Sequence, residues 1–358
     1  MVKRSRAAGS RRAIGLALLS AALFGLSTPA AKRLVAVSDP WVLAGLLYLG
    51  SGLGLGAYRL LSRFLAAPGA RPARLRSPDW PWLGGAILSG GCIAPVLLML
   101  ALRAGTASAT SLLLNLEGLF TALLAWFIFR EHYDRRIVLG MIAIGAGAAV
   151  LSGKGEGGQG LNVPALAAAG ACLAWALDNN LTRKVSAADP VQIAALKGMI
   201  AGVVNLTIGL GLGASLPPTV TMLGASVAGL LGYGLSLVLF VLALRELGAG
   251  RTGAYFSTGP FLGAVASVIA LGELLTPRLG IAAALMAFGV WLHASERHEH
   301  EHEHEALGHE HAHRHDEHHR HDHPPGTPSG ETHNHWHAHA PLRHRHPHFP
   351  DIHHRHDH

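Results

Sequence analysis

Long apolar runs alternate with short polar stretches along the first 295 residues of the chain. A helical run of roughly 20 apolar residues can cross a hydrocarbon core about 30 Å thick. Few of these runs carry the polar face, repeating every 3.6 residues, that a helix needs in a water-soluble fold. We therefore predict an all-α polytopic membrane protein with ten transmembrane helices, at 13–31, 40–61, 81–102, 107–129, 137–152, 163–182, 190–213, 220–244, 252–271 and 278–294.

The first apolar run follows a basic segment and ends in small residues, as a secretory signal would. Nine further runs come after it, and its sequence recurs later in the chain. We therefore interpret it as a retained first helix.

An internal repeat divides the membrane part. The stretch ALFGLSTPAAKRLVAVSDP (22–40) aligns without gaps with CLAWALDNNLTRKVSAADP (172–190), and 101–131 aligns with 243–273. Five predicted helices precede a glycine-rich linker and five follow it, and an odd number of crossings turns the second copy upside down. We predict two inverted five-helix repeats, an arrangement typical of alternating-access carriers. The segments are a basic N-terminus (1–12), the first repeat (13–152), the linker (153–162), the second repeat (163–295) and a tail (296–358).

The distribution of positive charge predicts the orientation. Residues 1–295 carry 23 Lys and Arg against 10 Asp and Glu. With the basic N-terminus in the cytoplasm, cytoplasmic segments hold 17 Lys and Arg and external segments hold 5, as the positive-inside rule requires. Lys32 and Arg33 are exceptions at the predicted outer end of the first helix. We expect a multi-pass protein of the plasma (inner) membrane with both termini cytoplasmic.

Two stretches at corresponding places of the repeat, 117–151 and 259–292, share a pattern. In the second copy, a proline precedes an apolar run, and Gly-Glu, Thr-Pro and a glycine-rich helix follow it, at Pro260, Gly272, Glu273, Thr276, Pro277 and Gly289. This pattern resembles the EamA domain of the drug/metabolite transporter superfamily. The first copy departs from it at Gly118 and Arg130, where the family has Pro and Gly. The resemblance implies ten helices and transport of small metabolites or drugs, and it names no cargo.

Three ionisable residues lie inside predicted spans: Glu117, Asp178 and Lys197. Placing a charge there costs a few kcal/mol, so each is a functional candidate. Asp178 and Lys197 both lie roughly 10 Å from the cytoplasmic ends of consecutive helices, at a rise of about 1.5 Å per residue, so they can pair. Such a pair either fixes the helix hairpin, or lets Asp178 bind a proton, a cation or a substrate amine while Lys197 balances its charge in the idle state. The sequence leaves both readings open.

Other polar residues surround these three. Asn179 and Asn180 point about 100° apart, so we expect one to face a cavity and the other to bond a neighbouring helix. Thr28 and Pro29 hold the equivalent positions in the first repeat, where the proline indicates either a packing kink or a broken helix at the site. Glu117 has no obvious cation partner in the sequence, which favours proton coupling. Asn115, Tyr233, Tyr255 and Ser257 complete the candidate substrate or coupling residues.

The tail has a different composition. It holds 6 Lys and Arg, 12 Asp and Glu, and 23 of the 25 histidines. So polar a segment cannot build an apolar core, and we predict that it is disordered. Imidazole and carboxylate groups bind Zn, Ni, Co or Cu, so we predict metal binding, the alternative being an inert tail of biased composition. Candidate ligands are His298, His300, His302, His304, His309, His311, His313, His315, His318, His319, His321 and His323.

Three functions compete. We favour a secondary carrier of a small organic metabolite or drug, coupled to protons or cations, because the spans hold no His pair or Met cluster for passing metals. The alternatives are a transition-metal carrier whose tail collects ions, and a non-transporting membrane anchor for a metal-buffering tail. With no P-loop and no nucleic-acid-binding module in the sequence, we expect neither an enzyme nor a nucleic-acid partner, and no required cofactor. A homodimer is left open.

Overall fold

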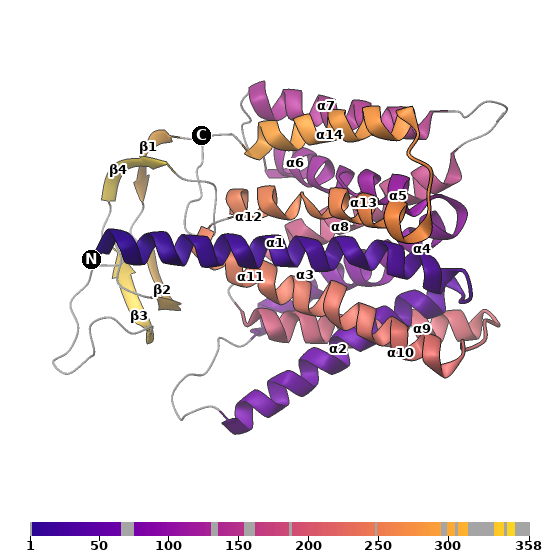
Figure 1. Ribbon diagram of the computed structural model, residues 1–358. Helices are drawn as coiled ribbons and strands as arrows, with labels where there is room; N and C mark the ends of the chain where they lie inside the picture. The colour runs from indigo at the N-terminus through magenta and orange to yellow at the C-terminus, as the bar shows by residue number, and fades with distance from the viewer. Residues whose placement is uncertain are drawn as a thin grey trace.

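The computed structural model describes residues 2–65, 75–129, 135–153, 162–185, 188–247 and 249–294, together with 299–304, 307–313, 333–339 and 342–347 in the tail. Residues 2–294 form a bundle of helices (Figure 1). Its first half comprises α1 (Val2–Val35), α2 (Pro40–Leu65), η1 (Ser77–Asp79), α3 (Trp80–Ala86), η2 (Ile87–Ile93), α4 (Ala94–Ala104), α5 (Ala107–Leu113), α6 (Leu116–Phe129) and α7 (Arg135–Ser152). Its second half comprises α8 (Val163–Arg183), α9 (Pro190–Gly211), α10 (Thr219–Gly229), η3 (Leu230–Leu235), α11 (Ser236–Leu247), α12 (Ala249–Phe256), α13 (Gly259–Leu271) and α14 (Pro277–Ala294).

Helices occupy all ten predicted spans, and the basic N-terminal segment continues α1 rather than standing apart from it. Among the described residues, seven helical segments are long and apolar enough to cross a membrane. The other three predicted spans do not reach this length or hydropathy. They contain α8, whose run Asp178-Asn179-Asn180 lowers its mean hydropathy, and the shorter helices α13 and α14. The fold is therefore a polytopic, all-helical membrane fold, and the count of ten crossings stays a prediction.

Four spans depart from regular α-helix, which hydropathy did not predict. The fourth span breaks between α5 and α6, and the ninth breaks between α12 and α13. The third and eighth spans contain the π-helices η2 and η3. In the repeat alignment the two breaks coincide to within one residue, as do the two π-helices. Both halves of the chain therefore carry the same backbone irregularities, which in α-helices are frequent at functional sites.

Close helix pairs join the two halves. α2 packs against α9, and α7 packs against α14. Glycine makes these approaches close: a Cβ added at Gly45 of α2 would lie 2.7 Å from the Leu206 nitrogen and 3.0 Å from the Gly202 oxygen of α9. We call these two contacts the glycine seams. Around them, α1 packs against α11 and α13, while α8 packs against α4 and α6, the partners at corresponding places of the repeat.

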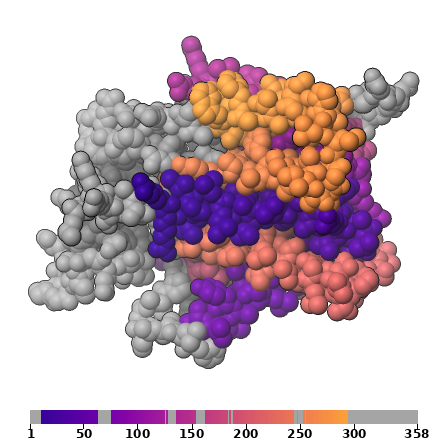
Figure 2. Space-filling model, viewed as in Figure 1, coloured from indigo at the N-terminus to yellow at the C-terminus, as the bar shows by residue number. Residues whose placement is uncertain are grey.

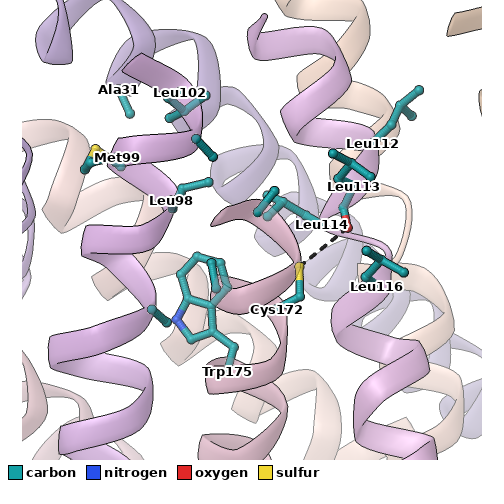
Figure 3. Close-up of a cluster of buried hydrophobic side chains, with 14 of the residues drawn as sticks. Ala31, Leu98, Met99, Leu102, Leu112, Leu113, Leu114, Leu116, Cys172 and Trp175 are labelled. Atoms are coloured by element: carbon teal, nitrogen blue, oxygen red, sulfur yellow. Dashed lines mark hydrogen bonds between the residues drawn. The ribbon is translucent and has the colours of Figure 1, made fainter. Parts of the chain in front are cut away.

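Apolar side chains cover the outside of the bundle as well as its interior. Figure 2 shows α1 lying along one face of the bundle. Its Leu18, Leu19 and Leu26 are exposed. Inside, Trp175 and Cys172 of α8 lie between Leu98 and Leu102 of α4 and the end of α5 (Figure 3). An apolar exterior of this kind suits contact with lipid.

The start of α1 and the end of α14 lie at the same end of the bundle, at the left of Figure 1. We call this the proximal end. The opposite end, where α1 leads into α2, α4 into α5, and α13 into α14, is the distal end (Figure 1).

The tail contains strands, contrary to our expectation of disorder. β1 (Glu299–His304) pairs antiparallel with β4 (Leu342–Pro347), and β2 (Leu307–His313) pairs with β3 (His333–His339). Alternation of histidine with other residues has the two-residue period of a strand, and pairing satisfies its backbone groups without an apolar core. The rest of the tail lies outside the described residues.

Candidate functional site

A buried ion pair joins α8 to α9. One carboxylate oxygen of Asp178 bonds Lys197 Nζ, and the other accepts from Thr182 Oγ1 at 2.9 Å. Asp178 is only 4% exposed. The pair predicted from the depths of the two residues is therefore present, and both oxygens of Asp178 have partners.

The π-helix η2 packs directly against this pair. A Cβ added at Gly90 would overlap the Asp178 carboxylate. The Gly90 carbonyl accepts from Tyr48 Oη at 2.6 Å and from Trp175 Nε1 at 3.1 Å. The next carbonyl, of Gly91, accepts from Asn205 Nδ2 at 3.1 Å. Side chains from α2, α8 and α9 thus bond the carbonyls of the π-helix and form a polar frame around Asp178.

Glu117 lies in a different setting, in the first turn of α6 just after the helix break. Its Oε1 accepts from Asn179 Nδ2 of α8 at 2.8 Å. Glu117 is partly exposed and Asn179 is exposed. No basic side chain in the described part of the chain forms an ion pair with Glu117. Because polar groups within a span face the bundle interior or water rather than lipid, the Glu117–Asn179 pair is the accessible polar element of the site.

The three consecutive polar residues of α8 therefore take three directions. Asp178 bonds Lys197 and Asn179 bonds Glu117, while Asn180 Nδ2 donates to the Ala176 carbonyl of its own helix at 2.9 Å. Asn180 is buried, so it belongs to helix packing rather than to the accessible pair.

The helix breaks account for two more predicted residues. Asn115, buried beside the break of the fourth span, donates to the Leu112 carbonyl at 2.9 Å, and its Oδ1 has no partner. Ser257, at the equivalent break, donates to the Gly253 carbonyl at 2.9 Å. The Leu113 carbonyl accepts from the Cys172 thiol at 3.5 Å (Figure 3). These side chains bond main-chain groups next to the breaks.

The remaining candidates lie elsewhere in the bundle. Thr28 is buried, and α1 continues through Pro29, so of the two alternatives left open for this proline the broken helix is contradicted. A Pro within a helix loses one main-chain bond, and packing of α1 against α11 and α13 compensates. Tyr233 packs its ring against Phe24 and Tyr48, 6.1 and 5.6 Å between centroids. Tyr255 lies partly exposed in α12.

Metal-ligand clusters are absent from the part of the chain that the structure describes, where no group of three or more His, Cys, Asp or Glu could hold an ion. His293 bonds the Ile137 carbonyl at 3.0 Å. Of the predicted tail ligands, six lie outside the described residues: His298, His315, His318, His319, His321 and His323. The other six lie on strands: His300, His302, His304, His309, His311 and His313.

Sequence reasoning missed the frame around Asp178. Trp175 precedes Asp178 by three residues, which places both on one side of α8, so this partner could have been found. Tyr48 and Gly90 gave no such indication, because their roles depend on the π-helix.

A helical bundle with an apolar exterior, paired repeats and polar groups within its spans is the architecture of a polytopic membrane transporter. The model of the EamA-like transporter family matches residues 11–153 and 162–295. The chain belongs to this family, within the drug/metabolite transporter superfamily. It is a family of transporters.

Curated proteins of two kinds are similar in sequence to this chain. An uncharacterized transporter of Methanothermobacter thermautotrophicus is 31% identical over 284 residues, which cover 75% of this chain and 82% of the relative. The probable 4-amino-4-deoxy-L-arabinose-phosphoundecaprenol flippase subunit ArnE of Pseudomonas aeruginosa is 40% identical over 106 residues, which cover 29% of this chain and 88% of that protein. A solved crystal structure of a protein shares the fold, with a TM-score of 0.57 and 20% identity over 78% of this chain and 95% of that one.

Proposed function

We propose that this protein is a secondary carrier that moves a small organic solute with a cationic group by alternating access. Glu117 binds the cationic group and a proton alternately, each replacing the other. The observation that carries the proposal is the accessible Glu117 carboxylate, bonded to Asn179 and without an ion pair among the described residues. A carboxylate in that position is stabilised by a bound proton or cation, since an isolated charge within a span is costly.

The charge balance of the site supports a cationic cargo. Asp178 and Lys197 neutralise one another, so the carboxylate of Glu117 is the charge left over in this group of three. An ammonium group can bond both Glu117 and the amide oxygen of Asn179. The name of the ArnE relatives specifies an amino sugar on a lipid carrier, and this chemistry agrees with a site for an amine.

The two alternatives are less well supported. A metal carrier needs several convergent ligands, whereas one carboxylate and one amide meet at Glu117. A protein that only anchored the tail in the membrane would need neither the helix breaks nor the accessible carboxylate. We place the carrier in the plasma (inner) membrane with both termini in the cytoplasm, on the strength of the basic N-terminal segment and basic proximal loops.

The test is transport by purified protein in liposomes with an imposed pH gradient, screened with a panel of small organic amines and neutral analogues. We expect amine-dependent proton flux with the wild type and none with Glu117→Gln, while Glu117→Asp retains part of it. Asp79→Asn, which removes a carboxylate from η1 at the start of the third span, is the control and should transport normally. Wild-type flux in Glu117→Gln would refute the role of this carboxylate.

We also propose that the tail binds divalent transition metals. The register supports this, because His300 lies opposite His346 and His302 opposite His344 in the β1–β4 ladder. In the β2–β3 ladder, three further histidine pairs lie opposite one another, His309–His337, His311–His335 and His313–His333. Residues opposite in an antiparallel pair have Cβ atoms about 5 Å apart, and imidazole is a common metal ligand.

A further inference from the structure

The two basic residues that contradict the charge rule, Lys32 and Arg33, lie in the last turn of α1 at the distal end. Lys32 Nζ donates to the Leu102 carbonyl at 2.5 Å and to the Gly105 carbonyl at 2.7 Å, at the end of α4. Arg33 donates to the carbonyl of Ala270, at the end of α13. Both cations therefore bond main-chain oxygens at the C-terminal ends of neighbouring helices.

Glu273 makes the complementary contact. It follows α13 directly, after Gly272, whose φ of 67° lies in the left-handed region that favours glycine. Its two carboxylate oxygens accept from the backbone nitrogens of Ala107 and Ser108, at 2.7 and 2.8 Å. These donors belong to the first turn of α5, which has no intrahelical acceptors for them.

Together the three side chains close a ring. α1 holds the turn between α4 and α5 through Lys32 and holds the end of α13 through Arg33, and α13 holds the same turn through Glu273. Each charge has the sign that stabilises the helix end it contacts. Two of the three links, those of Arg33 and Glu273, join the first repeat to the second. We call Lys32, Arg33 and Glu273 the distal ring.

The distal ring differs from the glycine seams in how easily it can open. The glycine seams bring backbone against backbone, so parting them would uncover main-chain surface and leave voids within the membrane. The links of the ring lie at helix ends near the membrane surface, where water can replace each side chain as a bonding partner. Separation of the repeats is therefore less costly at the ring than along the glycine seams.

We propose that the distal ring is a gate: it closes the distal mouth of the carrier in this structure, and its three links break when that mouth opens. The proposal rests on the alternating-access function proposed above. It also explains why two cations stand at an end of the bundle that is otherwise poor in positive charge.

Accessibility of the central site tests the gate without any knowledge of the cargo. In a background of Cys92→Ala and Cys172→Ala, Asn179→Cys provides a single thiol beside Glu117. A membrane-impermeant, charged thiol reagent is then applied to the distal face, in intact cells or in oriented vesicles. We expect Lys32→Met and Glu273→Ala each to raise the labelling rate from that face by about tenfold or more, through a shift toward the distal-open state.

Arg103→Met is the matched control, because Arg103 is an exposed cation in the last turn of α4 at the same end. It should leave the labelling rate unchanged. Unchanged distal labelling in Lys32→Met and Glu273→Ala, with protein that is monodisperse by size-exclusion chromatography, would overturn the proposal.

A locking experiment covers the case in which Lys32→Met and Glu273→Ala do not fold. Arg33→Cys with Ala270→Cys places two thiols across one link, and the protein folds before a short, reducible bifunctional reagent joins them. Crosslinking should stop substrate-driven proton flux, and reduction should restore it. Flux that continues in fully crosslinked protein would overturn the gate. Failure of the cargo screen alone would leave the labelling result standing, so the two proposals fail separately.

Discussion

Glu117 and Asp178 are both carboxylates inside the bundle, but their neighbours assign them different tasks. Both oxygens of Asp178 are bonded, its partner is a cation, and the backbone of Gly90 covers it. Glu117 has one amide partner and remains partly exposed. Asp178 therefore has a structural role, and Glu117 is the carboxylate that can exchange partners.

A mutant cycle on the buried pair tests this assignment. Lys197→Met leaves Asp178 buried without its cation and should lower stability by about 3–5 kcal/mol. In the double variant Asp178→Asn/Lys197→Met, the amide can still accept from Thr182 and no charge is buried, so the loss should be smaller. The measurement is thermal or denaturant unfolding of the purified protein in detergent.

Lys184→Met serves as the control for removal of a lysine. Its ammonium lies 5.9 Å from the Trp82 ring centroid near the end of α8, a contact worth about 0.5–1 kcal/mol at an exposed site. If the double variant were less stable than Lys197→Met, Asp178 would not be held as part of an ion pair.

The sequence predicted the Asp178–Lys197 pair because depth along two consecutive helices follows from residue counting. It could not predict that Asn179 reaches Glu117, since this contact depends on how α8 is rotated against α6. Repeat alignment relates α8 to α1 and says nothing of that rotation. We expected one of the two asparagines to bond a neighbouring helix, and Asn179 does so, whereas Asn180 bonds a carbonyl of its own helix.

At the scale of elements, hydropathy located the helices but not their internal breaks. Hydropathy counts side chains, whereas a break or a π-helix is a change in main-chain bonding. Asn115 and Ser257 were singled out as candidate ligands because they are polar within spans, and both bond main-chain carbonyls beside the breaks. The coincidence of the breaks in the two repeats became visible only when backbone geometry was compared.

The glycine seam between α2 and α9 gives a test at this scale. Gly45→Ala places a methyl group 2.7 Å from the Leu206 nitrogen, and we expect a loss of stability of about 1–3 kcal/mol from overpacking. Gly56→Ala, in the same helix, meets nothing within 4 Å and should be neutral or slightly stabilising. Unfolding midpoints of the two variants provide the comparison. Equal midpoints would mean that the seam accommodates a side chain.

At the scale of the whole molecule, the bundle combines contacts that hold the repeats together with contacts that can be exchanged. The seams α2–α9 and α7–α14 hold along their lengths, while the distal ring joins the repeats at helix ends alone. In the predicted orientation, Lys32 and Arg33 are exceptions to the positive-inside rule. These two residues bond helix termini, and a rule that counts charge in loops cannot register that role.

The tail is a separate unit of the molecule, and its removal tests its proposed task. We expect the full chain to bind several equivalents of Zn²⁺ or Ni²⁺ and a chain ending at residue 295 to bind none, by calorimetry and by metal analysis of purified protein. Binding should weaken from about pH 7.5 to about pH 5.5, because protonated imidazole cannot ligate. Equal metal content in both chains would refute the proposal, and equal transport by both would show that the carrier works without the tail.

The ion pair between α8 and α9 also has a consequence for synthesis of the protein. α8 carries Asp178 and two asparagines toward its C-terminal end. An aspartate there costs less during insertion than the roughly 2.5–3.5 kcal/mol of the helix centre, but it still opposes insertion. Its counter-charge, Lys197, lies on the helix that is made next. We therefore expect α8 to enter the bilayer stably only once α9 has followed it out of the ribosome, so that the two helices are inserted as one hairpin.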